Sequence, residues 1–341
     1  MFSMLRRWIG RRDYDDERGA TSASRSDNGV EQCHGPVVIP DERRDLLFDD
    51  RGLAQRYGAT LFTAGSYTEG TLTDEERMWL QDWQERVSLR DDSFVALVPR
   101  LPVVMPKLMA ALRDPEDIDL KRVANLIESD PVLSANVLQV VNSAAMRGTA
   151  GDIDSIPHAV TRMGRNSLRE VMSAAIVTPL YDFRRDARLN DEALRSIWSQ
   201  SLQIAANVKA GARLSGMPDR GFVLYLAALF HSAGLMVLLR ELKKLQCAQV
   251  SSDFVSEFER LARYASTKVA SGWEFDEEVA AILEAWAEGK AGVPDVALLS
   301  HAIEFGRVHY LCWFGHFDPD FCETYRSTLP DYARGWTCRL E

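Results

Sequence analysis

Helix-start signals recur along the chain, and each is followed by apolar residues at spacings of three and four. In two of them an aspartate stands directly before the first turn, Asp119 before Leu120 and Asp130 before Pro131. An aspartate side chain accepts hydrogen bonds from the free N–H groups of a first turn, and proline fits there because that position has no N–H partner to lose. Few segments alternate apolar and polar residues as strands do. The sequence therefore predicts an all-α protein.

The same signals predict where further helices begin and end. Gly164 suits the left-handed conformation that ends helices, so it is expected to separate two of them, with Asn166 capping the second. Asp191 is expected to begin a long helix, and Asp219 to cap the helix after it. Later amphipathic segments are predicted at residues 255–264, 277–286 and 296–313.

Residues 1–92 differ in composition from the rest of the chain. Residues 1–30 contain too few apolar side chains to offset the entropy of ordering, so a disordered tail is predicted there. Residues 31–92 are predicted to form an extension that packs on the main domain, because they are too few and too polar to hold a core alone. Residues 56–62 are expected to be a loop or short extended piece, and Thr73 to begin a helix with a capping box. The buried face predicted for that helix is Trp79, Leu80 and Trp83.

Two segments need a test for membrane contact. Residues 1–12 have no secretory signal pattern, but as a helix they would carry arginines on one flank and apolar side chains on the other, as a peripheral membrane segment does. A frayed basic terminus is the alternative. Residues 222–239 are apolar apart from His231 and Ser232. Because Gly234 follows directly, two buried helices that meet there explain this run better than a membrane-spanning helix with a histidine in lipid.

Charge and cysteine content exclude two classes of protein. The formal net charge is −10 and the pI is near 5.2, which argues against a nucleic-acid-binding protein because such binding depends on basic residues that neutralise phosphates. The five cysteines are odd in number and contain no CxxC pair, which indicates a reducing compartment and not a disulfide framework. A cytoplasmic protein is expected.

Six short motifs follow one another in an order and spacing typical of one family. They are LPVVMPKL at 101–108, DPVLS at 130–134, VVNSA at 140–144, SIPHAVTRMG at 155–164, WSQS at 198–201 and AALFHSAG at 227–234. Together they resemble the HDOD domain. The resemblance implies a bundle of helices followed by a helical part similar to the HD phosphohydrolase core. It also implies a role in bacterial signalling, often beside cyclic-dinucleotide pathways. The domain is placed at residues 93–290, with an aromatic-rich helical segment at 291–341 that packs on the core.

The motif at which related hydrolases bind metal is incomplete in this chain. Such enzymes hold one or two divalent metals with histidines and a His-Asp pair. Here Ser232 follows His231 in place of the aspartate, and a hydroxyl supplies no negative charge. Gln200 stands where those enzymes carry a histidine, and no histidine occurs between residues 232 and 300. We therefore expect no catalytic residue, no bound metal and no cofactor, with His231 as a core residue.

A second set of metal-ligating residue types lies near the C-terminus. His309, Cys312, His316 and Cys322 can be written as a zinc pattern, because imidazole and thiolate are the usual ligands of structural zinc. The spacing is loose, and many aromatic residues surround it. The favoured interpretation is a helix and turn that pack on the core, with small buried thiols.

Two groups of polar residues are candidates for binding a ligand or a partner. Three arginines surround the helix start at Asn166, where an anion such as a phosphate would fit; a solvated charged face is the alternative. An Asn-Ser pair stands where a helix ends, where it either lines a groove or bonds the free carbonyls and the following loop. The candidate residues are Asn142, Ser143, Arg162, Arg165, Arg169 and Trp198.

The function expected from these features is that of a non-catalytic bacterial signal-transduction protein, a pseudoenzyme whose HDOD domain binds other signalling proteins. Two alternatives stay open. One is a sensor that binds a cyclic dinucleotide without hydrolysing it, and the other is a residual metal-dependent phosphohydrolase around His231. No nucleic acid is expected as a partner, and residues 1–12 are the segment through which a membrane could be contacted.

Overall fold

The computed structural model describes residues 50–88, 118–143, 151–181, 186–273, 277–317, 319–333 and 335–337, with positions 94, 96–98, 104, 108 and 146 between them. All of these belong to one compact unit, Cys33–Glu341. The disordered tail predicted at residues 1–30, the membrane contact considered for residues 1–12 and most of the motif at 101–108 lie outside the described part.

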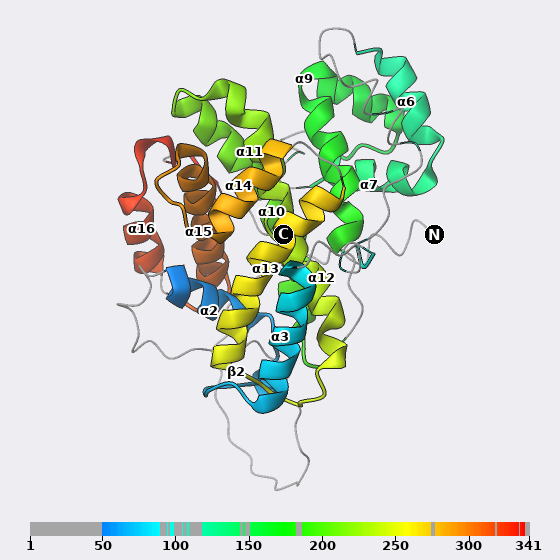
Figure 1. The fold of residues 1–341 in the computed structure, drawn as a ribbon. Helices are drawn as coiled ribbons and strands as arrows, with labels where there is room; N and C mark the ends of the chain where they lie inside the picture. The colour runs from blue at the N-terminus through cyan, green and yellow to red at the C-terminus, as the bar shows by residue number, and fades with distance from the viewer. Residues whose placement is uncertain are drawn as a thin grey trace, which may run out of the picture. The chain divides into compact units, whose positions relative to one another are not determined.

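The all-α prediction is confirmed, and the described helices form an early and a late group. The early group contains α6 (Leu120–Glu128), α7 (Pro131–Val141) and α9 (Ile156–Val177), with both α6 and α7 packed on α9 (Figure 1). The aspartate before α6 and the one before α7 each accept two backbone N–H groups, as predicted.

The late group carries most of the predicted site residues. Its helix α10 packs along α11, and α13 packs against both α12 and α14 (Figure 1). Short 3-10 turns connect several of these helices. The late helices are α10 (Asp191–Leu214), α11 (Gly221–Phe230), α12 (Ala233–Glu241), α13 (Ser252–Gly272), α14 (Glu277–Ala287), α15 (Pro294–Trp313) and α16 (Pro319–Thr328), and the turns are η5 (Thr178–Tyr181), η6 (Pro218–Arg220), η7 (Leu242–Lys244) and η8 (Asp331–Ala333).

The N-terminal extension lies against α13. Its helices α2 (Asp50–Thr60) and α3 (Asp74–Ser88) both contact α13, with the short turn η3 (Ala64–Ser66) between them. Its strand β1 (Tyr67–Thr68) pairs in parallel with β2 (Val250–Ser251), directly before α13. This pair is the one sheet within the described residues.

The capping box predicted at the start of α3 is confirmed. Thr73 Oγ1 accepts the Glu76 N–H at 3.2 Å, and the Glu76 carboxylate accepts the Thr73 N–H at 2.7 Å. The second oxygen of this carboxylate accepts the Ser251 N–H at 2.7 Å. One buried carboxylate therefore starts α3 and ties it to β2. The residues predicted for the inner face of α3, Trp79, Leu80 and Trp83, are buried.

The loop predicted at residues 56–62 is wrong in its first part, because residues 50–60 form α2. Gly58 lies inside this helix where it crosses α13. A Cβ atom at Gly58 would lie 2.7 Å from Val255 Cγ1 and 3.1 Å from Glu259 Cγ. The glycine serves close packing of two helices, a role that local sequence patterns do not distinguish from a turn.

The apolar run at residues 222–239 forms two buried helices, as predicted. By length and composition the stretch Pro218–Lys244 could cross a membrane, yet 89% of its most apolar window is buried inside the fold. α12 begins at Ala233, one residue before Gly234. A Cβ atom on Gly234 would lie 2.6 Å from the Ala265 carbonyl carbon and closer still to the Ser266 nitrogen, so this glycine lets α12 meet the backbone of α13.

Of three predicted helix boundaries, those at Gly164 and Asp191 are confirmed and the cap at Asp219 is wrong. Gly164 has a φ of 63° and breaks the regular geometry inside α9, so the expected break is there, although one continuous element spans it. α10 begins at Asp191 as predicted, and Asn190 directly before it is the cap. Asp219 is not the cap of α11, because it lies in η6: Arg220 directly precedes α11 without a side-chain cap, and the Gly221 N–H donates to the Pro218 carbonyl.

The described C-terminal residues return to α10. The Asn207 side chain donates to the Thr337 carbonyl at 2.9 Å, and the Gln203 amide donates to Thr337 Oγ1 at 3.1 Å. Trp336 is buried beside Gly211, where a Cβ atom would lie 3.1 Å from the indole ring. The segment therefore forms part of the same core as α10.

Candidate functional site

His231 lies directly after α11 and is buried. Its Nδ1 lies 2.6 Å from the carbonyl oxygen of Ala228. Since a carbonyl can only accept, Nδ1 carries the proton and Nε2 the lone pair. Burial lowers the pKa of His231 to about 4, so the ring is neutral near pH 7. Trp286 of α14 meets the ring edge-on, with centroids 6.2 Å apart.

Ser232 is held in a closed set of hydroxyl contacts. Its Oγ lies 2.9 Å from the Tyr181 hydroxyl and 2.8 Å from Ser201 Oγ. The Tyr181 hydroxyl in turn donates to the Leu229 carbonyl at 2.7 Å. All three hydroxyls are therefore satisfied inside the core, by partners from η5, α10 and the junction of α11 with α12.

Gln200 and Trp198 lie on α10, and both side chains are buried. Gln200 Nε2 donates to Ser196 Oγ at 2.8 Å, one turn earlier in the same helix. Trp198 packs on the Tyr181 ring, with centroids 4.7 Å apart. The three positions of the incomplete metal motif, Gln200, His231 and Ser232, are thus all engaged in bonds within the core.

A buried ion pair lies near these residues and is absent from the predicted site. Arg307 of α15 donates to a carboxylate oxygen of Glu259 of α13 at 2.7 Å, and the two side chains are 8% and 4% exposed. The guanidinium also lies over the Tyr57 ring of α2, 4.9 Å from its centroid. After the larger effect of burial, the charge of Arg307 contributes to the low pKa of His231. The Arg307 guanidinium therefore places a positive charge near His231.

Tyr57 connects the ion pair with α10. Burial raises the pKa of the Tyr57 hydroxyl, and Arg307 and a hydrogen bond with Gln200 oppose that rise. Tyr57 thus touches one member of the incomplete motif and covers the guanidinium of the ion pair. Side chains from α2, α10, α13 and α15 meet here.

The sequence contained a sign that Glu259 is a buried charge. It lies in α13 on the stripe formed by Val255, Phe258 and Ala262, at spacings of three and four, where an apolar residue is expected. A carboxylate on such a stripe requires a buried partner. The partner itself is 48 residues away on another helix, so the spacing alone does not identify Arg307.

The residues at this place do not fit a catalytic metal. Divalent cations of hydrolases need several imidazole or carboxylate ligands around one point. Here the motif offers one imidazole, and the nearby carboxylate is bonded to a guanidinium. In the part of the chain that the structure describes, no three His, Cys, Asp or Glu side chains lie together in a group that could hold a metal ion.

More than half of the chain, residues 98–288, matches the sequence pattern of the HDOD domain. The chain belongs to the HDOD domain family. Its structure is similar to that of a proposed metal-dependent phosphohydrolase from Shewanella amazonensis SB2B, with a TM-score of 0.51 and 22% identity over 75% of this chain and 98% of the other. It is also similar to an HDOD domain protein of unknown function from Geobacter sulfurreducens, with a TM-score of 0.50 and 23% identity over 78% and 90%. These likenesses concern the fold. No curated protein matches the chain.

The HDOD range contains only part of the cluster around His231. Gln200, His231 and Glu259 lie within residues 98–288, but Tyr57 precedes the range and Arg307 follows it. The ion pair of this HDOD protein is therefore completed by helices from outside the family domain.

The Asn-Ser pair of the HDOD motif fastens the end of α7. Asn142 exchanges two hydrogen bonds of 2.8 Å with the backbone of Ile153, donating to its carbonyl and accepting from its N–H. Ser143 Oγ donates to the Val140 carbonyl at 2.6 Å. Both side chains thus join the helix end to the loop before α9, which corresponds to the structural alternative considered for them.

The described arginines of α9 contact two different parts of the chain. Arg162 donates to the Gly151 carbonyl at 2.9 Å. Arg169 lies over the Phe222 ring, 4.1 Å from its centroid. The side chains of Arg165 and Asn166 lie outside the described part. The described contacts of Arg162 and Arg169 are thus with different parts of the chain, and the anion site considered for the arginines stays a prediction.

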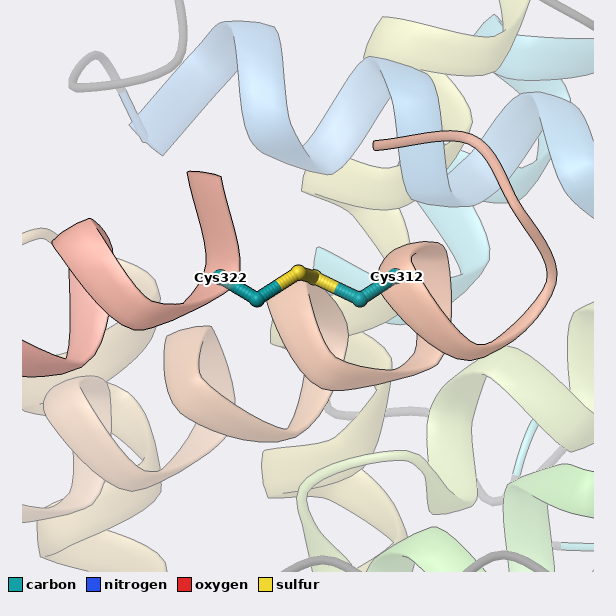
Figure 2. Close-up of a disulfide and its surroundings, with 2 residues drawn as sticks. All are labelled: Cys312 and Cys322. Atoms are coloured by element: carbon teal, nitrogen blue, oxygen red, sulfur yellow. A yellow bond between two sulfur atoms is a disulfide. The ribbon is translucent and has the colours of Figure 1, made fainter. Parts of the chain in front are cut away.

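The zinc pattern near the C-terminus is not assembled, because Cys312 and Cys322 form a disulfide with Cα atoms 6.4 Å apart (Figure 2). The expectation of small buried thiols is wrong at these positions, because the turn after α15 brings Cys322 of α16 next to Cys312 at the end of α15. A disulfide offers no thiolate to a metal. His309 packs on the Phe305 ring, with centroids 4.3 Å apart. Burial lowers the pKa of both His309 and His316.

Proposed function

We propose that this protein is a non-catalytic HDOD protein that acts in bacterial signal transduction by binding other signalling proteins. The observation that carries the proposal is the Arg307–Glu259 ion pair near His231. A buried guanidinium brings the positive charge that a metal brings in a hydrolase, and it takes the nearby carboxylate as its partner. Glu259 is then committed to an arginine and not to a divalent cation.

The contacts of the motif residues support the same conclusion. A phosphohydrolase of this fold uses a metal-bound water as nucleophile, which requires ligands that are free to turn toward the metal. Ser232 instead contacts Tyr181 and Ser201, and Gln200 donates to Ser196. The protein retains the helical scaffold while its motif side chains stabilise the core, an arrangement that suits a binding domain.

The proposal includes a cytoplasmic location. It is supported by the small, odd number of cysteines and the absence of a CxxC pair. In that compartment, glutathione and dithiol proteins act on any exposed disulfide, and they would act on the bond between Cys312 and Cys322.

The test of the non-catalytic part uses the full-length protein, His231→Ala, and His158→Ala as a control on the exposed side of α9. Each is incubated with manganese or ferrous iron and freed of excess ions. Elemental analysis is expected to find no stoichiometric metal in any of the three, and none is expected to hydrolyse a cyclic dinucleotide. Turnover in wild type and His158→Ala that is lost in His231→Ala would contradict the proposal.

The binding part is tested by cross-linking in cells, followed by reconstitution of the complex from purified components. A stoichiometric complex with a signalling protein that persists in the presence of a chelator is expected. A protein that forms no such complex, yet shifts its melting temperature with a cyclic dinucleotide, would favour the sensor alternative, because a ligand that binds only the folded state raises stability.

A further inference from the structure

The Cys312–Cys322 disulfide closes a short turn between two helices. Cys312 lies in the last turn of α15 and Cys322 in the first half of α16, ten residues apart in sequence. Figure 2 shows the bond running from one helix directly to the other. Both cysteines are only partly buried.

The turn enclosed by the disulfide holds aromatic side chains against the fold. Phe317 is buried and packs on Phe321, with ring centroids 4.7 Å apart. Arg56 of α2 lies over the Phe317 ring, 5.7 Å from its centroid. Tyr325 of α16 is buried as well. The disulfide therefore secures α16 and a turn that contacts the N-terminal extension.

Within the described residues, α16 packs chiefly on one neighbouring helix. Its contacts with other elements are mainly with α15, the helix to which the disulfide also joins it. Arg326 reaches the Phe305 ring, 5.7 Å from its centroid, and donates to the Trp336 carbonyl. A ten-residue helix that packs chiefly on one neighbour gains support from a covalent link, because short helices are marginal on their own.

We propose that the Cys312–Cys322 disulfide is a reversible clasp, opened by a dithiol reductant, that releases α16 and the turn before it. The inference rests on the proposed cytoplasmic location, since the few disulfides found in that compartment are usually transient and redox-sensing. The open form exposes the aromatic face made by Phe317, Phe321 and Tyr325.

The reaction is a thiol–disulfide exchange. A thiolate of the reductant attacks one of the two sulfurs, the Cys312–Cys322 bond breaks, and a mixed disulfide forms. The second thiol of the reductant then attacks the mixed disulfide. The reductant leaves as its own disulfide, having given two electrons, and Cys312 and Cys322 take up two protons as free thiols.

The experiment compares hydrogen exchange of the full-length protein in its air-oxidised and dithiol-treated states. Peptides from residues 314–330 are expected to exchange at least about tenfold faster after reduction, because breaking the covalent loop frees a segment that packs chiefly on α15. Peptides from α10 and α13 are expected to keep their rates. Non-reducing mass spectrometry of the oxidised sample must show the cross-linked Cys312–Cys322 peptide.

Two variants control the comparison. Cys312→Ser/Cys322→Ser is expected to exchange fast in both conditions, with no response to dithiol. Cys247→Ser removes the half-buried free thiol that follows η7 and is expected to respond as wild type does. Because wild type is compared with itself in two redox states, the test does not depend on the folding of either variant.

Three results would overturn the clasp. They are equal exchange of residues 314–330 in the two states, a disulfide that a thioredoxin-type dithiol protein cannot open in the folded chain, and absence of the cross-linked peptide. None of them bears on the metal and turnover measurements, which involve no cysteine. Failure of the clasp is therefore distinct from failure of the proposed function.

Discussion

At the scale of single residues, the ion pair of Arg307 with Glu259 makes each side chain dependent on the other. Both side chains are buried away from water, and a buried ion without a partner retains a large desolvation penalty. Removal of one partner is therefore far more harmful than removal of both.

We predict that Arg307→Met lowers the free energy of unfolding by about 3–5 kcal/mol, because Glu259 is left buried and unpaired. The double variant Glu259→Leu/Arg307→Met is expected to recover most of this loss, since apolar side chains then pack on Tyr57. Urea denaturation followed by circular dichroism measures both. A double variant no more stable than Arg307→Met would show that the two residues are not coupled.

We predict from the low pKa of His231 that the free energy of unfolding falls in mild acid. Its pKa is about 4 in the folded state against 6.5 for an ordinary histidine, so between these values the unfolded chain binds a proton that the folded chain does not. Stability contributed by the neutral ring is complete above pH 6.5 and falls as the pH drops toward 4, by up to about 3 kcal/mol.

Unfolding free energies measured at pH 7.0 and pH 5.0 test this prediction. The loss on acidification is expected to be smaller in His231→Gln than in wild type, while His158→Gln, at an exposed position of α9, is expected to match wild type. An identical loss in all three proteins would exclude His231 as its source.

The sequence analysis located the three motif positions but not the ion pair near them. Gln200, His231 and Ser232 lie within short motifs of the sequence. Their difference from the ligand types of a metal site is therefore visible without a structure. Arg307 and Glu259 are paired across two helices. Such pairing depends on tertiary packing, which no spacing within one helix determines.

At the scale of elements, the approach of α12 to α13 depends on Gly234. We predict that Gly234→Ala lowers the free energy of unfolding by about 1–3 kcal/mol or more, because the added methyl group meets backbone atoms of α13 and not a flexible side chain. Gly292→Ala is the matched control, as nothing lies within 4 Å of a Cβ atom there. Equal stabilities in thermal melts would contradict the packing argument.

Helix starts were predictable where the cap is local, and not where packing decides. Asp119, Asp130 and Thr73 each bond the first turn of their own helix. Gly58, in contrast, lies inside α2 because α13 passes close by. The disulfide was missed for a related reason, since a cysteine count indicates a compartment but does not show which two side chains a turn brings together.

At the scale of the whole molecule, the compact unit is larger than the family domain. Trp79 of α3 packs on Phe254 and Phe258 of α13, with ring centroids 5.6 and 5.7 Å away. At Gly306 of α15, a Cβ atom would lie 2.9 Å from the side chain of Ile204. Helices on both sides of residues 98–288 therefore cover apolar surface of the HDOD domain.

We predict that residues 98–288 alone do not form a rigid native structure, because removal of α2, α3 and α15 exposes the apolar sides of α10 and α13. For this fragment we expect a weak near-ultraviolet circular dichroism signal and a narrow dispersion of amide proton chemical shifts. For residues 50–341 we expect the strong signal and wide dispersion of a folded protein. A cooperative thermal transition of the fragment at the temperature of the longer chain would contradict this.

The return of the C-terminal residues to α10 has a consequence for synthesis on the ribosome. Asn207 bonds Thr337, 130 residues later, and at roughly 5–20 residues per second that partner is made about 6 to 26 seconds after Asn207. Until then, part of the surface of α10 has no native cover. We expect a nascent chain that has not yet reached Thr337 to present this surface to solvent, where it is open to aggregation or to chaperones.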